Sequence, residues 1–362
     1  MPRAAMLELG VIADDLTGGV KLASLLTRAG VRCPVVMSAD ALETLDDDAA
    51  AVVVGRKLLA RPAREAVEDA ARTGRALLAR GARQLYYKYS ALFSSTERGN
   101  IGPVAEALMD LTGSGHVLFC PARPERRATL YQGRLFLGSA MLHETPRRHD
   151  PVTPMTNSNL VEVLQSQSRV RVGLLGHGTL RSGKAASERY LGEQRAAGVR
   201  FFLVDAIDGS DLDRIAELVR DAPLVTGSDD LPVALARRWP ASGGPPGPPL
   251  PSAAGDAVLI AGSCTPKTGR QLARFEQAHP VLRIDLLQAA RDAATVERVV
   301  DWAAERFAHG PLGVATTTDA DGVRRAQAEL GRAGAAALAD GLLGRLAQRL
   351  YGLGARNFVV AG

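Results

Sequence analysis

Short runs of apolar residues alternate with amphipathic stretches along this chain, and that alternation constrains the fold more than any other feature. Stretches such as 64–79 and 185–197 carry their apolar residues at helical spacing. The runs with strand character include 7–13, 51–55, 84–87, 117–120, 171–175, 200–205 and 223–226. Strands that alternate with helices in this way favour a parallel sheet covered by helices. We therefore expect an α/β fold.

The alternation is interrupted once, by a segment over 241–255 that is rich in proline and glycine. Such a composition cannot form regular structure and is typical of a linker. Beyond it a second α/β unit begins, with strand-like runs at 257–261, 281–285, 312–316 and 357–361. The chain of 362 residues is long enough for two domains. We predict an N-terminal domain over 1–240, the linker 241–255 and a C-terminal domain over 256–362.

Charge and composition exclude several functional classes. The net charge is +5, but only five of the 44 basic residues are lysines, and aromatic residues make up 4%. Nucleic-acid binding favours basic stripes interleaved with aromatic rings, so we expect no nucleic-acid partner. No apolar run approaches the roughly 18 residues of a membrane helix, so we expect no membrane partner. Three widely spaced cysteines form no CxxC pair, which predicts a reducing compartment, the cytoplasm.

Two adjacent carboxylates, Asp14 and Asp15, follow the first predicted strand and precede a helix predicted over 20–28. Open α/β sheets bind their ligands at the carboxyl ends of strands. The pair therefore fits a ligand for substrate hydroxyls, a general base or a magnesium ligand. The alternative is that Asp15 or Thr17 simply caps the helix. The residues alone leave both interpretations open.

A second candidate site lies between the predicted strand 84–87 and an amphipathic helix. It holds Lys88, the hydroxyl pair Ser95 and Thr96, Arg98, and the dipeptide Gly99-Asn100. A lysine and an arginine can hold a carboxylate or a phosphate, while hydroxyl and amide groups orient a polyol. The alternative is a capped loop with charges on its surface.

Two small-residue turns have the composition of phosphate sites. Residues 178–184 fit the pattern GxxxxGK, but Ala185 lacks the hydroxyl that a P-loop needs for magnesium, so we give this match little weight. The turn after strand 257–261 contains Gly262 and Ser263, whose backbone N–H groups we expect to be available for a phosphate. Histidine and cysteine spacing predicts no metal site.

At these positions the sequence resembles the four-carbon acid sugar kinase family, and within it the 3-oxo-tetronate kinase branch. The resemblance extends along nearly the whole chain and rests on ordered motifs. They lie at residues 10–18, 87–104, 121–122, 131–133, 150–155, 224–227, 261–264 and 357–362.

The resemblance implies a two-domain kinase with a cleft between its domains. The N-terminal domain would hold a small sugar acid, and the C-terminal domain would hold ATP with Mg²⁺. Carried onto this chain, the implied catalytic residues are Asp15, Lys88 and Arg98. The implied ligand contacts are Asp14, Ser95, Thr96, Gly99 and Asn100 for the acid, and Gly227, Gly262, Ser263 and Gly362 for the nucleotide. A homodimer is compatible with this picture.

Several positions depart from the pattern of the family. Lys21 and Ser94 stand where aspartates are usual, Ala128 where an arginine is usual, and Asn157 where another aspartate is usual. The stretch around Ala128 has Arg123 in place of phenylalanine, and a glycine-rich turn has become Gly227-Ser-Asp-Asp230. The sequence stops at Gly362, before the Gly-Glu-Thr-Ser loop that the resemblance leads us to expect. The leading hypothesis is an ATP-dependent sugar-acid kinase. The alternatives are a degenerate member that binds a metabolite or nucleotide, and a repurposed enzyme with another substrate.

Overall fold

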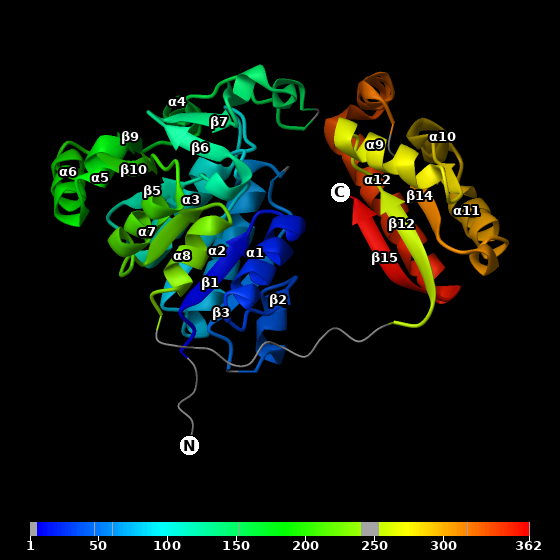
Figure 1. Ribbon diagram of the computed structural model, residues 1–362, viewed down its shortest axis with the longest axis horizontal. Helices are drawn as coiled ribbons and strands as arrows, with labels where there is room; N and C mark the ends of the chain where they lie inside the picture. The colour runs from blue at the N-terminus through cyan, green and yellow to red at the C-terminus, as the bar shows by residue number, and fades with distance from the viewer. Residues whose placement is uncertain are drawn as a thin grey trace. The chain divides into compact units, whose positions relative to one another are not determined.

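The computed structural model describes residues 6–46, 48–59, 61–150, 152–239, 253–316 and 318–361. The chain divides into two compact units, Met1–Pro248 and Pro249–Gly362 (Figure 1). Most of the predicted linker, residues 241–252, lies outside the described residues, and so does the candidate nucleotide ligand Gly362.

The first unit is built on an eight-stranded sheet in which every neighbouring pair is parallel. Its central strands are buried on both faces, as their continuous apolar runs predict. In spatial order the strands are β2 (Val35–Val36), β3 (Ala51–Gly55), β1 (Leu9–Ala13), β4 (Gln84–Lys88), β11 (Leu224–Gly227), β5 (Val117–Cys120), β10 (Val199–Val204) and β9 (Arg171–Leu175).

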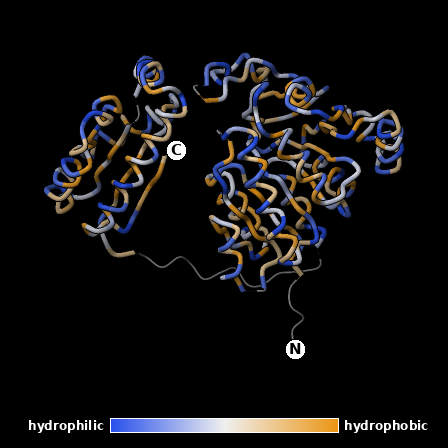
Figure 2. The backbone as a smooth tube through the Cα atoms, turned by 180° about the vertical axis from the view of Figure 1, so that it is seen from behind, coloured by the Kyte–Doolittle hydropathy of each residue, from blue (hydrophilic) through white to orange (hydrophobic). Residues whose placement is uncertain are grey.

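Helices connect these strands and bury their apolar stripes against the sheet. In Figure 2, hydrophobic residues run along the strands, and hydrophilic residues recur along the outer helices. The helices of this unit are α1 (Leu16–Arg28), α2 (Ala63–Ala79), α3 (Ile101–Thr112), α4 (Leu160–Gln167), α5 (His177–Arg181), α6 (Lys184–Ala196), α7 (Gly209–Leu218) and α8 (Asp230–Ala236).

The first unit also carries a small antiparallel sheet that the alternation of apolar runs did not predict. It consists of β6 (Ala128–Tyr131), β7 (Arg134–Leu137) and β8 (Ala140–Met141). Gln132 and Gly133 form the turn between β6 and β7, and both have positive φ, at 50° and 71°. A two-residue turn with this backbone matches the twist of a hairpin.

The second unit is a four-stranded parallel sheet in the order β13 (Val281–Arg283), β14 (Leu312–Ala315), β12 (Asp256–Ala261) and β15 (Ala355–Ala361). Its helices are α9 (Pro266–Glu276), α10 (Leu286–Arg291), α11 (Thr295–Ala304) and α12 (Ala320–Gly352). Helix α12 is broken at Gly331, which has φ 71°. A separate apolar core lies between this sheet and its helices.

Most predicted elements form within a few residues of their expected bounds. The first helix is an informative exception, because it begins at Leu16 rather than at residue 20. Asp15 is its N-cap and accepts a hydrogen bond from the N–H of Gly18, so two glycines are incorporated into the first turn. Among the described residues, no helix is long and apolar enough to cross a membrane.

Candidate active site

Four neighbouring strands of the first unit end at one edge of its sheet. Ala13 of β1 lies beside Lys88 of β4, and Lys88 lies beside Gly227 of β11, which in turn lies beside Cys120 of β5. Because the strands are parallel, the residues that follow them gather at the same edge. The sheet order also reverses between β1 and β4, and α/β sheets bind ligands outside such a switch point.

Asp15 and Lys88 form the ion pair at this switch point. Lys88 Nζ lies 3.2 Å from Asp15 Oδ2, while Asp15 Oδ1 accepts the Gly18 N–H at 2.7 Å. A Cβ added at Gly18 would overlap the Lys88 ammonium, so glycine is needed there for the lysine to reach its partner. The Asp15 side chain is 33% exposed. It therefore acts as a helix cap and also presents a carboxylate at the surface, which unites the two interpretations of the sequence.

Asp14 is buried behind this pair. It is 1% exposed, and neither carboxyl oxygen has a hydrogen-bond partner among the described residues. Burial raises the pKa of Asp14 to about 8, against an opposing effect of the Lys88 charge. Burial also acts to raise the pKa of Asp15, but Lys88 and the Gly18 N–H outweigh it and lower that pKa. At neutral pH the pair therefore combines a protonated Asp14 with an ionised Asp15.

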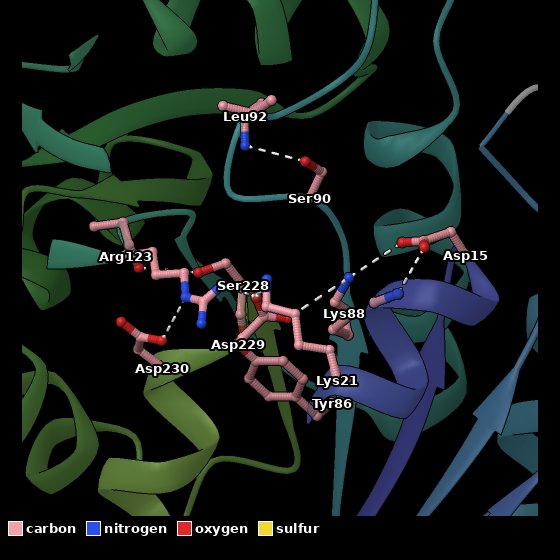
Figure 3. Close-up of polar contacts among 12 residues, drawn as sticks. Asp15, Lys21, Tyr86, Lys88, Ser90, Leu92, Arg123, Ser228, Asp229 and Asp230 are labelled. Atoms are coloured by element: carbon pink, nitrogen blue, oxygen red, sulfur yellow. Dashed lines mark hydrogen bonds and ion pairs between the residues drawn. The ribbon is translucent and has the colours of Figure 1, made fainter. Parts of the chain in front are cut away.

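Lys88 lies between Asp15 and a second carboxylate, Asp229 (Figure 3). The Lys88 side chain is 3% exposed, and its Nζ is 3.7 Å from Asp229 Oδ1. Burial alone would lower the pKa of Lys88, but the charges of Asp14, Asp15 and Asp229 outweigh it and raise that pKa. The lysine is thus held as a buried cation.

Asp229 also binds two further cations. Lys21 Nζ of α1 lies 2.5 Å from its Oδ2 atom, and Arg123 Nη1 lies 3.1 Å from the same atom. Arg123 Nε contacts Asp230 Oδ1 at 2.9 Å. The result is a continuous network of alternating charges from Asp15 to Asp230, which we call the ion network (Figure 3).

The turn that carries Asp229 is held by two buried hydrogen bonds of the neighbouring Ser228. The buried Tyr86 hydroxyl donates to the Ser228 carbonyl at 2.7 Å, and Ser228 Oγ donates to the Ala122 carbonyl at 2.9 Å. Gly227 has no room for a side chain, since a Cβ there would lie 2.5 Å from both the Cys120 carbonyl oxygen and the Tyr86 hydroxyl. These contacts fix where the Asp229 carboxylate points.

Two positions at which we expect a departure from the family pattern are joined here. Lys21 and Asp229 form an ion pair with each other. Ala128 lacks the usual arginine, but Arg123 exchanges two backbone hydrogen bonds with Ala128, at 2.7 and 3.1 Å. The Arg123 guanidinium thus enters the ion network from the segment that pairs with Ala128. Sequence reasoning missed Arg123 and Asp229 as site residues, although both were visible as changed positions.

The loop before α3 carries the remaining candidates for the acid. Asn100 is buried, and its amide donates to the carbonyls of Leu58 and Arg61 at 2.7 and 3.1 Å. Ser95 is also buried, and its Oγ accepts from Gln167 at 2.9 Å. The Gly99 N–H donates to the Thr96 carbonyl at 2.8 Å.

Arg98 lies in the same loop and is free to meet a ligand. It is exposed and makes no hydrogen bond or ion pair with any residue that the structure describes. Asn157, one of the changed positions, forms no part of the ion network. Its side chain bonds instead to Glu162 and to the Asn159 N–H near the start of α4.

The candidate nucleotide residues are distributed between the two units. Gly227 lies in the first unit beside Lys88, and Gly262 and Ser263 lie in the second, after β12. The expectation that the Gly262 and Ser263 N–H groups are available is wrong, because both donate to the Ala361 carbonyl, at 3.1 and 3.0 Å. These bonds extend the pairing of β12 with β15 past the end of the strand.

The match to GxxxxGK at 178–184 does not form a P-loop. Its first residues lie in helix α5, and Lys184 opens α6, where it pairs with Glu188. Within the described ranges, no group of three or more histidine, cysteine or acidic side chains is arranged to hold a metal ion.

Comparisons with known proteins agree with the two-unit architecture. A family model described as "Sugar-binding N-terminal domain" matches residues 9–235, and one described as "Nucleotide-binding C-terminal domain" matches residues 258–362. Curated proteins named 3-oxo-tetronate kinase match almost the whole chain. Those from Burkholderia multivorans and Cupriavidus necator are 38% and 39% identical over 98% of this chain and 83% of their own length. The Escherichia coli protein is 35% identical over 99% of this chain and 93% of its own.

The chain belongs to the four-carbon acid sugar kinase family. The predicted family, the α/β fold with two domains and the class of enzyme, a phosphotransferase, are therefore confirmed. The alternative of a member that only binds a metabolite is not favoured, because full-length relatives are named as kinases.

Solved structures also match nearly the whole of this chain. A protein from Salmonella typhimurium LT2 superposes with a TM-score of 0.79 at 34% identity, over 99% of this chain and 86% of that one. One from Haemophilus influenzae gives 0.67 at 31% identity, over 98% and 85%. A structure from Bordetella bronchiseptica gives 0.54 at 25% identity, over 98% and 83%, and is a domain-swapped dimer with bound citrate.

Proposed function

We propose that this protein transfers the γ-phosphoryl group of ATP to a hydroxyl of 3-oxo-tetronate or a related four-carbon sugar acid. The observation that carries the proposal is the Asp15–Lys88 pair, at 3.2 Å, on the ligand-binding edge of a sugar-binding domain. The names of the full-length relatives support the substrate class.

Asp15 is the proposed base. Its ionised carboxylate is partly exposed and can accept the proton of the substrate hydroxyl. The hydroxyl oxygen then forms a bond to the γ-phosphorus as the bond to the β-phosphate oxygen breaks, and ADP leaves. Lys88 provides a fixed positive charge beside the reacting oxygen, where negative charge accumulates.

Asp14 has a proposed role in orienting the reacting groups. Because it holds its own proton at neutral pH, it adds no second negative charge beside Asp15. Its protonated carboxyl is also a hydrogen-bond donor for the base or for a substrate oxygen that reaches it. This supports the orienting role that we assign to Asp14.

The loop 95–100 is the proposed binding site for the acid. Arg98 would bind the substrate carboxylate, since its exposed guanidinium has no partner among the described residues. Ser95, Thr96, Gly99 and Asn100 would shape the wall against which the hydroxyls lie. Replacing Arg98 by glutamine should raise KM about tenfold or more with little change in kcat. Arg64→Gln, which removes an exposed guanidinium paired with Glu68, is the matched control.

ATP binding is assigned to the C-terminal domain. We propose contacts at the turn of Gly262 and Ser263, and further contacts at Gly227 and Gly362. Mg²⁺ would arrive with ATP and neutralise phosphate charge. Magnesium bound to phosphates needs only one or two protein carboxylates.

A homodimer in the cytoplasm is the proposed state of the enzyme. The Bordetella bronchiseptica relative, a domain-swapped dimer, supports the dimer. Cys33, Cys120 and Cys264 are unpaired, which supports a reducing compartment. Light scattering of the purified protein measures its oligomeric state directly.

The test is ADP release in the presence of Mg·ATP, measured across a panel of four-carbon acids. We expect turnover with 3-oxo-tetronate or a close relative, and a loss of about 10²-fold or more in Asp15→Asn. Asp208→Asn, which changes a cap on the distant helix α7, serves as the control. If no acid of the panel caused ADP release, the proposed substrate class would be rejected. Full turnover in Asp15→Asn would reject Asp15 as the base.

A further inference from the structure

Three cationic side chains meet around one carboxylate in the ion network. Lys21 and Arg123 lie 2.5 and 3.1 Å from Asp229 Oδ2, and Lys88 lies 3.7 Å from Oδ1. The cations come from α1, from the segment after β5 and from the end of β4. Convergent lysine and arginine side chains are what proteins use to bind a carboxylate or phosphate. Here a side chain of the protein itself occupies that anion position.

The anion position is closed except on one side. The side chains of Asp229 and Lys88 are each 3% exposed and that of Arg123 is 6% exposed, whereas Lys21 is 42% exposed. Asp229 Oδ1 has no hydrogen-bond partner among the described residues. A ligand carboxylate approaching past Lys21 would meet a buried carboxylate already in place, and like charges in such a setting repel strongly.

The charges around this position also balance. With Asp14 protonated, the three anions Asp15, Asp229 and Asp230 offset Lys21, Lys88 and Arg123. The ion network around Lys88 therefore has no net positive charge, which suits a hydroxyl better than a carboxylate.

We propose that Asp229 is a specificity-determining residue that fills this anion position from within the chain, so that a sugar acid presents its uncharged hydroxyl end to Lys88. The proposed orientation of the sugar acid rests on the proposed kinase function. The anion position among Lys21, Lys88 and Arg123 does not depend on that function. A consequence is discrimination against dicarboxylates, whose second charged end would face Asp229.

The direct test removes the Asp229 carboxylate by mutation and supplies formate in its place. Asp229→Ala removes one carboxylate and leaves a space of that size among three cations, for which formate is the matching probe. Melting temperatures are compared in 100 mM sodium formate and 100 mM sodium chloride, without ATP or acid. For a Kd of about 10 mM we expect formate to raise the Tm of Asp229→Ala by about 3 to 6 °C.

Three controls accompany this measurement. The wild type and Asp229→Asn, in which the position stays filled, should show no shift specific to formate. Asp213→Ala removes a carboxylate that pairs with Arg237 and Arg238 near the surface, and it should show none either. An equal shift in the wild type or the absence of a shift in Asp229→Ala would overturn the anion position. If Asp229→Ala does not fold, Asp229→Ser provides the same vacancy with a smaller polar group.

Turnover tests the specificity itself. The ratio of kcat/KM for a four-carbon monocarboxylate to that for a four-carbon dicarboxylate should fall about tenfold from wild type to Asp229→Ala. Formate added to the variant should restore the wild-type ratio. An unchanged ratio would overturn the role in specificity. If the wild type phosphorylates no acid, the kinase proposal fails, and the formate shift still decides whether Asp229 holds an anion position.

Discussion

The Lys21 ammonium lies 2.5 Å from Asp229 Oδ2, which joins the first helix of the chain to the turn before α8. Each residue removes the electrostatic penalty that the other would cause alone. A lysine on α1 without this partner would add a third cation beside Lys88 and Arg123. The pair therefore has to be understood as one change.

The first prediction concerns the strength of this pair. Lys21→Met, Asp229→Asn and the double variant form a cycle, and we expect a coupling energy of about 1 to 2 kcal/mol in the unfolding of the N-terminal domain, measured in urea. The exposed pair Lys184–Glu188, studied in the same way, should give no more than about 0.5 kcal/mol. A coupling for Lys21–Asp229 as small as that of the exposed pair would mean that the two charges do not depend on each other.

The second prediction concerns Gly18. An alanine there would overlap the Lys88 ammonium, so Gly18→Ala should displace the lysine and reduce kcat at least about tenfold. Gly192→Ala is the matched control, because that glycine lies inside helix α6 with open space around it. It should keep full activity and gain about 0.5 to 1 kcal/mol of stability. Full activity in Gly18→Ala would show that Lys88 need not lie beside Asp15.

The third prediction concerns Lys88 itself. Lys88→Met keeps most of the side-chain volume and removes the charge, so kcat/KM should fall about 10²- to 10³-fold. Because Lys88 helps to lower the pKa of Asp15, the acid limb of the pH profile should move to higher pH. Lys184→Met is the control on the surface. An unmoved acid limb would argue against Asp15 as the titrating base.

The fourth prediction follows from the raised pKa of Asp14. Between its ordinary value of 3.8 and about 8, the folded chain holds a proton that the unfolded chain releases. This contribution to the free energy of unfolding therefore decreases as pH rises, on the order of 1 kcal/mol per pH unit. Asp14→Asn should lose less stability than the wild type between pH 5 and 8, measured in urea at each pH. Asp208→Asn should keep the wild-type slope, because the pKa of Asp208 is lowered and its titration lies below this range. If the free energy of unfolding depended on pH equally in Asp14→Asn and in the wild type, Asp14 would not hold this proton in the folded chain.

The sequence predicted those structural features that depend on residues close together in the chain. The apolar runs that became β1 and β3 are uninterrupted, so their identity as buried strands was readable. The carboxylates after β1 and the lysine ending β4 followed from the rule that parallel strands end together. The hairpin over 128–141 was missed because its strands mix charged, polar and apolar residues in short runs, and its turn depends on the backbone of Gln132 and Gly133.

The ion network could not be predicted, because its pairs are remote in sequence. Arg123 and Asp230 are 107 residues apart, and Lys88 and Asp15 are 73 apart. No local sequence pattern shows that Lys21 on α1 pairs with Asp229, which follows β11. The Gly262 and Ser263 N–H groups illustrate the same limit, because only the position of Ala361 in β15 determines that they are already bonded.

Asn100 has a consequence for how a small ligand is captured. Its amide ties the loop before α3 to the Leu58 and Arg61 carbonyls, and the Leu58 N–H donates to the Asp14 carbonyl. The proposed wall that carries the hydroxyl groups is thus ordered during folding, together with the end of the strand that leads to the proposed base. The loop before α3 therefore has little backbone conformational entropy left to lose on binding, so the few contacts that a four-carbon molecule can make there are offset less by that loss.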